Sequence, residues 1–389
     1  MEKFIIPPSV TAVIDKIEHE GYEAWLVGGC VRDLLRGETP HDYDIASNAP
    51  CEAVCAMFER VIETGLKHGT VTVIYDGEPI EVTRYRIDGG YADHRRPDSV
   101  KFTGSFEDDL SRRDFTVNAI GYSLSRGLFD RFGGKKDIEK GILRTVGDAE
   151  KRFDEDALRI MRAVRFASTL GYSIEQSTLN AAKKLAPTLR NVSAERIYSE
   201  LKKTLCGERP SLIEIPVKSG GLKHIGLCEC ESLLPLDRIS ASPNVRLAAL
   251  IHLCKAEPKA VMQALKSDKA ARNAVISLCE MLENKQPLDR ANLKRMLSRA
   301  DKDELFALLT AYTAIFGIDT EAAKATLSDI IQKNEPYRIC DLDIDGDALR
   351  EMGICGKAAG KTLSFLLDRV IENPMLNTRE QLKKLADRH

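Results

Sequence analysis

The segments that say most about this chain are GGCVRD, residues 28–33, and HDYDIAS, residues 41–47. The apolar run AWLV at 24–27 predicts a strand, and the two glycines after it let the backbone turn tightly and approach a ligand closely. The sequence VRDLLRG at 31–37 then predicts a short helix whose first-turn amides can face an anion. This order of strand, glycine turn and helix indicates a phosphate cradle.

Three acidic residues follow the glycine turn. Asp42 and Asp44 are two positions apart, so on a strand both side chains point the same way. Two carboxylates facing one spot repel each other unless a cation lies between them, and oxygen ligands beside a phosphate cradle favour Mg²⁺ that also holds a triphosphate. Glu81 lies in IEVTRYR at 80–86, the second arm of a hairpin with the turn DGE at 76–78. If the hairpin joins the same sheet, all three carboxylates surround the metal, as in many nucleotidyl transferases.

Composition indicates a soluble globular protein. The chain has 389 residues, 43% hydrophobic and 30% charged, which suits roughly two to four structural units. No apolar run is long enough to span a bilayer, the first residues lack a signal-peptide pattern, and the ten cysteines show no recurring CxxC spacing, so we expect a cytoplasmic protein with no membrane partner. The net charge of −2 does not suggest a nucleic-acid binder, but it hides a local basic cluster. The cluster consists of Lys183, Lys184, Arg190, Arg196, Lys202 and Lys203.

Secondary-structure patterns change along the chain. Up to about residue 150 short β-like runs alternate with turns, and strands are expected at 71–75, 80–86 and 100–103. After Asp154 nearly every segment has helical periodicity, with breaks near prolines. The predicted fold class is therefore α+β, a mixed head followed by a long all-helical remainder.

Arginines and a further aspartate stand in LSRRDFTVNAI, residues 110–120. Arg112, Arg113 and Asp114 precede an apolar run that reads as helix-like. Because arginine presents a planar fork that matches phosphate oxygens, and aspartate caps helix starts, this segment predicts phosphate contacts beside a capped helix.

A second charged motif, FDEDALRIMRAVRFAS at 153–168, has the period of one amphipathic helix. Its polar ridge places Asp156, Arg159, Arg162 and Arg165 at i, i+3 spacing. The first and last members point to opposite sides of the helix, so all four cannot contact one small group. Asp156 and Arg159 are neighbours and can contact the same group. An ordinary ion pair with two surface arginines is the alternative interpretation.

In this order and spacing, these motifs resemble those of the class II tRNA nucleotidyltransferases, the CCA-adding enzymes, in the short bacterial type without a phosphohydrolase domain. The resemblance continues in ERIYSELKKTL at 195–205 and in the C-terminal tail. It implies a seahorse-like molecule that begins with a polymerase β-like nucleotidyltransferase head built on a mixed or antiparallel sheet. The implied domains are a catalytic head at 1–149, a base-recognition neck at 150–210, and helical tRNA-binding regions, the body at 211–320 and the tail at 321–389.

The resemblance also implies roles for single residues. Asp42 and Asp44 would hold Mg²⁺, with Glu81 as the third catalytic carboxylate. The nucleotide's phosphates and sugar would contact Gly29, Arg32 and Arg113, and its base would be read by Asp156 and Arg159, with Arg162 and Arg165 completing the pocket.

Base reading by this pair has a chemical rationale. Cytosine and adenine both present an exocyclic amine beside a ring-nitrogen acceptor, whereas uracil and guanine present a carbonyl beside a ring N–H. A carboxylate accepts from the amine and a guanidinium donates to the ring nitrogen. Asp156 beside Arg159 therefore fits C and A and leaves unpaired groups against U and G.

The implied activity is addition of C, C and A to the tRNA 3′ end from CTP and ATP, dependent on Mg²⁺, releasing pyrophosphate and using no nucleic-acid template. The implied partners are the tRNA acceptor arm and 3′ end and nucleoside triphosphates, and a homodimer is left open. An A-only enzyme, a CC-only enzyme, a poly(A) polymerase and an RNA-binding protein on an inactive scaffold are the alternatives. The charged, glycine-rich loop DGGYADHRRPDS at 88–99 argues against a CC-only enzyme. The absence of a long basic arm after ADRH argues against a poly(A) polymerase. The retained carboxylates argue against an inactive scaffold.

Overall fold

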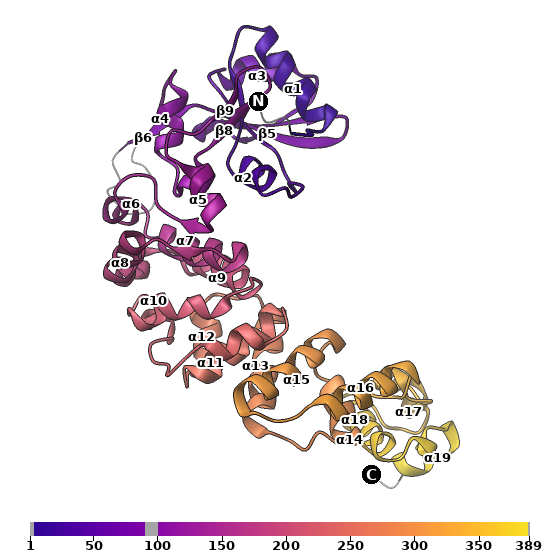
Figure 1. The fold of residues 1–389 in the computed structure, drawn as a ribbon. Coiled ribbons are helices and arrows are strands. Elements are labelled where there is room, and N and C mark those ends of the chain that lie inside the picture. The colour runs from indigo at the N-terminus through magenta and orange to yellow at the C-terminus, as the bar shows by residue number, and fades with distance from the viewer. Residues whose placement is uncertain (1–3, 90–99, 388–389) are drawn as a thin grey trace. The chain divides into compact units, whose positions relative to one another are not determined.

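The chain forms two compact units in the computed structural model, which describes residues 4–89 and 100–387 (Figure 1). Unit 1 extends to residue 208 and takes in 215–224, and unit 2 comprises the remainder. This division does not separate a head from a neck or a body from a tail, so the boundaries of the four predicted domains stay predictions.

A seven-stranded mixed sheet forms the centre of the first part of unit 1. Its spatial order is β3-β4-β5-β2-β1-β8-β9, and every neighbouring pair is antiparallel except β2 with β5. The strands are β1 Ala24–Val27, β2 Asp44–Ser47, β3 Val61–Gly65, β4 Thr70–Tyr75, β5 Glu78–Arg84, β8 Gly121–Ser123 and β9 Gly127–Phe129.

The predicted hairpin is present and joins this sheet. Asp76 and Gly77 link β4 to β5 with positive φ angles of 49° and 81°, the backbone that two-residue hairpin turns require. Because β5 pairs with β2 in parallel register, Glu81 lies opposite Asp44. The prediction that the hairpin brings Glu81 beside the aspartates is confirmed at the level of the backbone.

A short ribbon carries the ends of the predicted specificity loop at 88–99. It pairs β6, Arg86–Asp88, with β7, Val100–Phe102. Residues 90–99 lie outside the described residues, so the role of this loop in switching from C to A stays a prediction.

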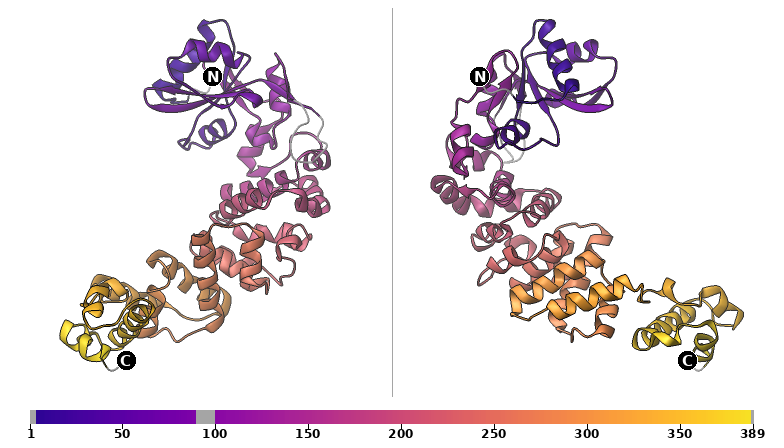
Figure 2. Two further views of the ribbon diagram at one scale, coloured as in Figure 1. Left: turned by 180° about the vertical axis from the view of Figure 1, so that it is seen from behind. Right: turned by 45° about the vertical axis from the view of Figure 1, so that its right-hand side comes forward.

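Helices cover the sheet and extend unit 1. In Figures 1 and 2, α1 and α3 lie on one side of the sheet and α2 on the other, while α7 packs on α9 and α6 on α8. A second small ribbon joins β10, Ile142–Leu143, to β11, Ser173–Ile174. The helices of this unit are α1 Pro8–His19, α2 Gly29–Leu35, α3 Cys51–Met57, α4 Phe106–Ser111, α5 Gly134–Lys140, α6 Ala149–Glu155, α7 Leu158–Leu170, α8 Gln176–Leu185 and α9 Ala194–Leu205.

Two sequence-based helix predictions are wrong in detail. The run at 115–120 is not an α-helix: a single 3₁₀ turn, Thr116–Asn118, leads into β8, and the whole segment is buried, so tertiary packing overrides its helical appearance. The motif at 153–168 is two helices, because Asp156 leaves the helical region with φ −141° and ψ 104°. Its carboxylate then accepts from the amide of Leu158, which starts α7 anew.

Unit 2 is all-helical. Buried apolar residues of α11, α13 and α15 form one part of its interior, and a separate apolar cluster ties α17, α18 and α19 together. None of the helices in the described chain is both long and apolar enough to cross a membrane. The helices are α10 Glu214–Lys218, which straddles the two units, α11 Pro243–Leu253, α12 Pro258–Ala264, α13 Lys269–Asn284, α14 Arg290–Leu297, α15 Lys302–Phe316, α16 Glu321–Gln332, α17 Gly346–Glu351, α18 Lys357–Glu372 and α19 Arg379–Ala386.

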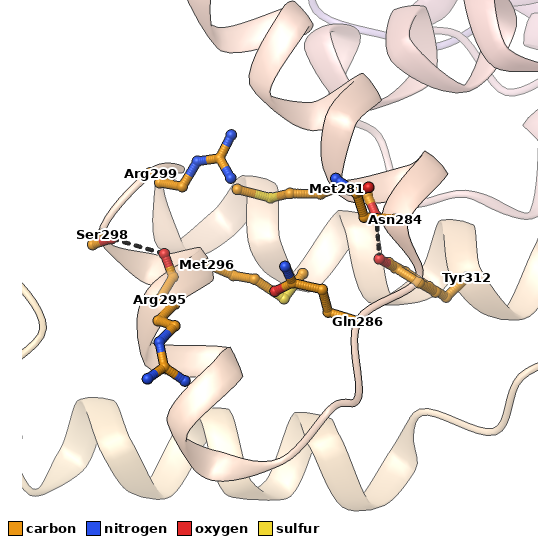
Figure 3. A pocket seen from close by; sticks show the side chains of 8 residues that line it. All are labelled: Met281, Asn284, Gln286, Arg295, Met296, Ser298, Arg299 and Tyr312. Carbon is orange, nitrogen blue, oxygen red and sulfur yellow. Dashed lines mark hydrogen bonds between the residues drawn. The ribbon is translucent and has the colours of Figure 1, made fainter. Parts of the chain in front are cut away.

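A cavity of about 270 Å³ lies between α13, α14 and α15 of unit 2 (Figure 3). Two of its polar side chains already have protein partners: the Tyr312 hydroxyl donates to the carbonyl of Met281 at 2.5 Å, and Arg295 pairs with Asp368 at 2.7 Å. None of the residues predicted to act on the nucleotide lies here.

Candidate active site

A larger cavity of about 660 Å³ lies in unit 1 and collects almost every predicted site residue. Its wall is strongly polar. It is lined by Gly28, Gly29, Arg32, Asp42, Asp44, Arg86, Arg112, Arg113, Asp114, Asn118, Asp156, Leu158, Arg159, Arg162, Arg165, Phe166 and Arg196. Glu81 is the one predicted residue that is not among them.

The glycine turn brings backbone and an arginine close together. Gly28 has φ 76°, and a Cβ atom at this position would stand 3.2 Å from Nη1 of Arg113. A side chain here would therefore be strained and would press on the arginine. The helix that follows, α2, has seven residues, and its Arg32 donates to Asn118 and Asp33, both at 2.8 Å.

The carboxylates lie at one part of the cavity wall. Asp44 opens β2, whereas Asp42 lies two residues before that strand, so the prediction that both stand on one strand face is wrong for Asp42. Burial, together with the charges of Glu81 and Asp42, raises the pKa of Asp44 to about 6. Glu81 is exposed and acts on Asp44 from the neighbouring strand. Among the described residues, no three His, Cys, Asp or Glu side chains are close enough to form a ready metal cluster.

Arg112 and Arg113 project from the end of α4 with a common anchor. Asp109, which is buried, accepts from Arg112 at 2.8 Å and from Arg113 at 3.2 Å. Burial by itself would raise the pKa of Asp109, but the two guanidiniums hold that pKa below its ordinary value. The anchor fixes both arginines at the cavity wall.

Asp114 does not cap a helix as predicted. Its Oδ2 accepts from Nε and Nη2 of Arg162 at 2.8 and 2.5 Å, and its Oδ1 accepts from the amide of Phe115 and from Asn118. Although burial opposes its charge, the bound Arg162 keeps the pKa of Asp114 below the ordinary range. This bidentate pair joins α7 to the segment after α4.

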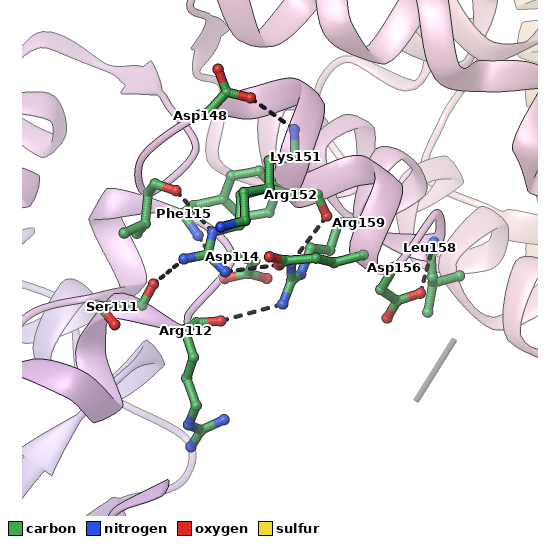
Figure 4. A network of polar contacts seen from close by, with 12 residues as sticks. Ser111, Arg112, Asp114, Phe115, Asp148, Lys151, Arg152, Asp156, Leu158 and Arg159 are labelled. Atoms are coloured by element: carbon green, nitrogen blue, oxygen red, sulfur yellow. Dashed lines mark hydrogen bonds and ion pairs between the residues drawn. The ribbon is translucent and has the colours of Figure 1, made fainter. Parts of the chain in front are cut away.

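Asp156 and Arg159 both line the cavity but are not paired with each other, so the alternative interpretation, an ordinary ion pair between them, is wrong. Asp156 Oδ2 accepts from Arg196 of α9 at 3.2 Å. Arg159 donates to Glu155 at 2.6 Å and to the carbonyls of Arg152 and Arg112 at 3.0 and 3.3 Å (Figure 4). The break between α6 and α7 separates the two side chains, and each is held by other partners.

The structure adds residues that sequence reasoning did not place in the site. Arg86 and Asn118 belong to segments quoted in the sequence analysis, 80–86 and 110–120, but neither residue was singled out there. Arg196 was named only as a member of the basic cluster, with no role in the cavity. Among the described residues that line this wall, Phe166 is the one aromatic side chain. Phe166 directly follows Arg165 in the second charged motif, and this position could have indicated that it lies at the site.

Two known protein families match segments in the first part of the chain. Residues 24–144 match the family described as poly A polymerase head domain, and 171–225 match the one described as probable RNA and SrmB-binding site of polymerase A. The CCA-adding enzyme of Lactiplantibacillus plantarum is 48% identical over 394 residues, which cover 96% of this chain and 94% of that protein. This chain belongs to the CCA-adding enzyme family. The predicted α+β nucleotidyltransferase fold is thereby confirmed.

Solved structures of CCA-adding enzymes share this fold. The Bacillus stearothermophilus enzyme in complex with CTP matches with a TM-score of 0.82 at 30% identity, covering 98% of each chain. The Thermotoga maritima enzyme complexed with tRNA matches with a TM-score of 0.64 at 18% identity, covering 98% of this chain and 96% of that one, a likeness of fold alone.

Proposed function

We propose that this chain adds C, C and A in turn to the 3′ end of tRNA, using CTP and ATP, with the cavity of unit 1 as the site of transfer. The tRNA 3′ hydroxyl attacks the α-phosphate of the nucleotide, the new phosphodiester bond forms, and pyrophosphate leaves. The observation that carries this proposal is that one cavity contains two carboxylates, an arginine-rich wall and the Asp156–Arg159 segment.

The charge of the cavity suits a triphosphate. Eight arginines and four aspartates line it, an excess of four positive charges. Seven of these arginines are tied to buried or half-buried carboxylates, so their guanidiniums are fixed before a ligand arrives. Fixed donors cost little reorganisation when they bind a phosphate, which favours binding and charge stabilisation during transfer.

Mg²⁺ fits the carboxylate part of the cavity. Asp42 and Asp44 would hold it, because burial and the charges of Glu81 and Asp42 raise the pKa of Asp44 despite the opposing charge of Arg113, and a cation there would relieve this repulsion. The ion supplies polarisation of the phosphate and a lowered pKa for the attacking hydroxyl. Glu81 contributes its charge from the adjacent strand.

Base selection rests on Asp156 and Arg159. Arg196 and the Leu158 amide hold the carboxylate, while Glu155 and two carbonyls hold the guanidinium. A carboxylate oxygen accepts more than one hydrogen bond, so the exocyclic amine of C or A can share Asp156 with Arg196. Arg162 and Arg165 complete the wall.

A stepwise assay tests the proposal. Purified protein is given tRNAs that end before the first C, after C, or after CC, each with a single nucleoside triphosphate. CTP should extend the first two substrates and ATP the third by one residue, with UTP and GTP unused. Extension of the third substrate alone would indicate an A-only enzyme, a run of A residues would indicate a poly(A) polymerase, and no extension would contradict the proposal.

A further inference from the structure

Phe166 presents an apolar ring in a cavity wall made mostly of arginine and aspartate side chains. It lies near the C-terminal end of α7, is only 9% exposed, and meets the ring of buried Phe115 edge to face with centroids 5.7 Å apart. Because it carries no donor or acceptor, it cannot hydrogen-bond a nucleotide. Its contribution must therefore come from its ring face or its volume.

Three guanidiniums surround this ring. Their central carbons lie 3.8 Å (Arg165), 5.3 Å (Arg162) and 5.5 Å (Arg32) from the ring centroid. These distances are within the range in which a cation is attracted by the negative face of an aromatic ring. All three arginines line the cavity, and they come from two different helices, α2 and α7.

Each of these arginines also has a polar partner. Arg162 binds Asp114, Arg165 binds Glu200 at 2.9 Å, and Arg32 donates to Asn118. Three like charges gathered around one point repel each other, and in a half-buried site this repulsion is stronger than in water. A carboxylate at position 166 would relieve the repulsion but would cancel positive charge and repel phosphate. A neutral ring relieves it without either cost.

We propose that Phe166 is a positioning residue: its ring gathers Arg32, Arg162 and Arg165 into one arrangement that presents their charge to the polyphosphate of the incoming nucleotide. This inference rests on the proposed function, because it takes the cavity to be the nucleotide site. Without the ring the three side chains spread apart, so ground-state binding weakens more than turnover.

The test compares variants that alter the ring face with variants that keep it. Phe166→Leu removes the π face and keeps an apolar side chain, and Phe166→Tyr keeps the face. Phenylalanines carrying one, two or three fluorines at this position weaken the face stepwise at nearly constant shape. Phe316→Leu is the matched control, since Phe316 also has a cation, Lys285, 4.0 Å from its ring centroid but lies in unit 2.

KM and kcat for CTP are measured with tRNA ending before the first C. Phe166→Leu should raise KM about tenfold with kcat nearly unchanged, the loss expected for cation–π attraction in a partly desolvated site. Phe166→Tyr should restore most of the affinity, KM should rise with each added fluorine, and Phe316→Leu should match the wild type. Unchanged KM across the fluorine series would show that the ring acts by volume alone and would overturn the proposal.

A binding measurement separates this inference from the proposed function. Calorimetry with inorganic triphosphate needs neither tRNA nor turnover. Phe166→Leu should bind inorganic triphosphate about tenfold more weakly than wild type, while circular dichroism shows an unchanged fold. If the wild type adds no nucleotide to tRNA, the proposed function fails and this comparison still decides the role of Phe166. Equal binding by the two proteins would contradict the inference.

Discussion

The carboxylates of unit 1 differ in the sign of the charges that surround them. Asp114 and Asp109 are surrounded by guanidiniums, which hold their pKa values low. Asp44 has acidic neighbours, and burial and their charges raise its pKa to about 6. The first two are thus anchors for arginines, whereas the acidic neighbours of Asp44 outweigh the opposing charge of Arg113. The neighbouring charges therefore distinguish Asp109 and Asp114, which hold arginines in place, from Asp44, the candidate metal ligand.

Replacing Asp44 by Asn should abolish transfer while leaving tRNA binding intact. The substitution keeps the shape and removes the charge that would hold Mg²⁺, so a loss of about a thousandfold in kcat is expected from several kcal/mol of lost charge stabilisation. Single-turnover CMP incorporation measures the effect. The control is Asp15→Asn on the exposed side of α1. Near-normal turnover of the Asp44 variant would remove this residue from the metal site.

At the scale of the element, the sequence predicted correctly the structures that short-range residue patterns determine. Asp76 and Gly77 carry the hairpin, and the strand pattern after them places Glu81 opposite Asp44. The restart of the helix at Asp156 was missed because it depends on a side-chain cap and on a distant partner, Arg196. The conformation of the buried run at 115–120 was predicted wrongly. Packing against other segments determines this conformation, and sequence periodicity carries no information on that packing.

A buried ion pair joins α14 to the segment that follows α16, beside ion pairs of Arg290 with Asp329 and Glu335. Lys294 is 1% exposed and donates to Glu335 at 2.6 Å. Hydrogen bonds from Arg290 and Lys294 lower the pKa of Glu335 to about 2. A depressed carboxyl pKa stabilises the fold above the ordinary value near 4.5, and this stabilisation is lost as the pH falls towards 2.

Glu335→Gln should therefore lower the local stability of α14 and α16 at pH 7 by about 3–5 kcal/mol, because it leaves a buried ammonium unpaired. Hydrogen exchange of their amides, detected by mass spectrometry, measures the local opening free energy. Glu321→Gln breaks the exposed pair with Lys324 and should change it by less than about 1 kcal/mol. The Glu335 effect should shrink towards pH 3. An effect that is equal at both pH values would show that the pair's charge does not matter.

At the scale of the whole molecule, Lys202 and Lys203 of the basic cluster, which do not line the cavity, are the candidate contact with tRNA outside it. Lys202 lies over the ring of Tyr198 at 4.6 Å and Lys203 is exposed, both in the last turn of α9. Most contacts of proteins with structured RNA are to phosphates and the 2′-hydroxyl, so the predicted contribution is to affinity and shape recognition rather than to sequence.

Reversing both charges, Lys202→Glu with Lys203→Glu, should weaken tRNA binding and reduce the slope of log affinity against log salt by about 1–2. Filter binding across a salt series measures both quantities. Lys136→Glu with Lys140→Glu on α5 is the charge-matched control, since both lysines are exposed. An unchanged slope in the α9 variant would make its lysines ordinary solvated surface.

Selection of the base by protein side chains is tested most directly by the ratio of CTP to UTP incorporation efficiencies in wild type and Asp156→Ala. Loss of the acceptor for the exocyclic amine should reduce this ratio by about 1–3 kcal/mol, or roughly 5- to 150-fold. Asp148→Ala controls for loss of a helix cap, because Asp148 accepts from the Lys151 amide at the start of α6 and does not line the cavity (Figure 4). It should keep the wild-type ratio. An Asp156 variant that loses activity equally with every nucleotide would contradict base reading and leave Asp156 as a cap and an ion-pair partner.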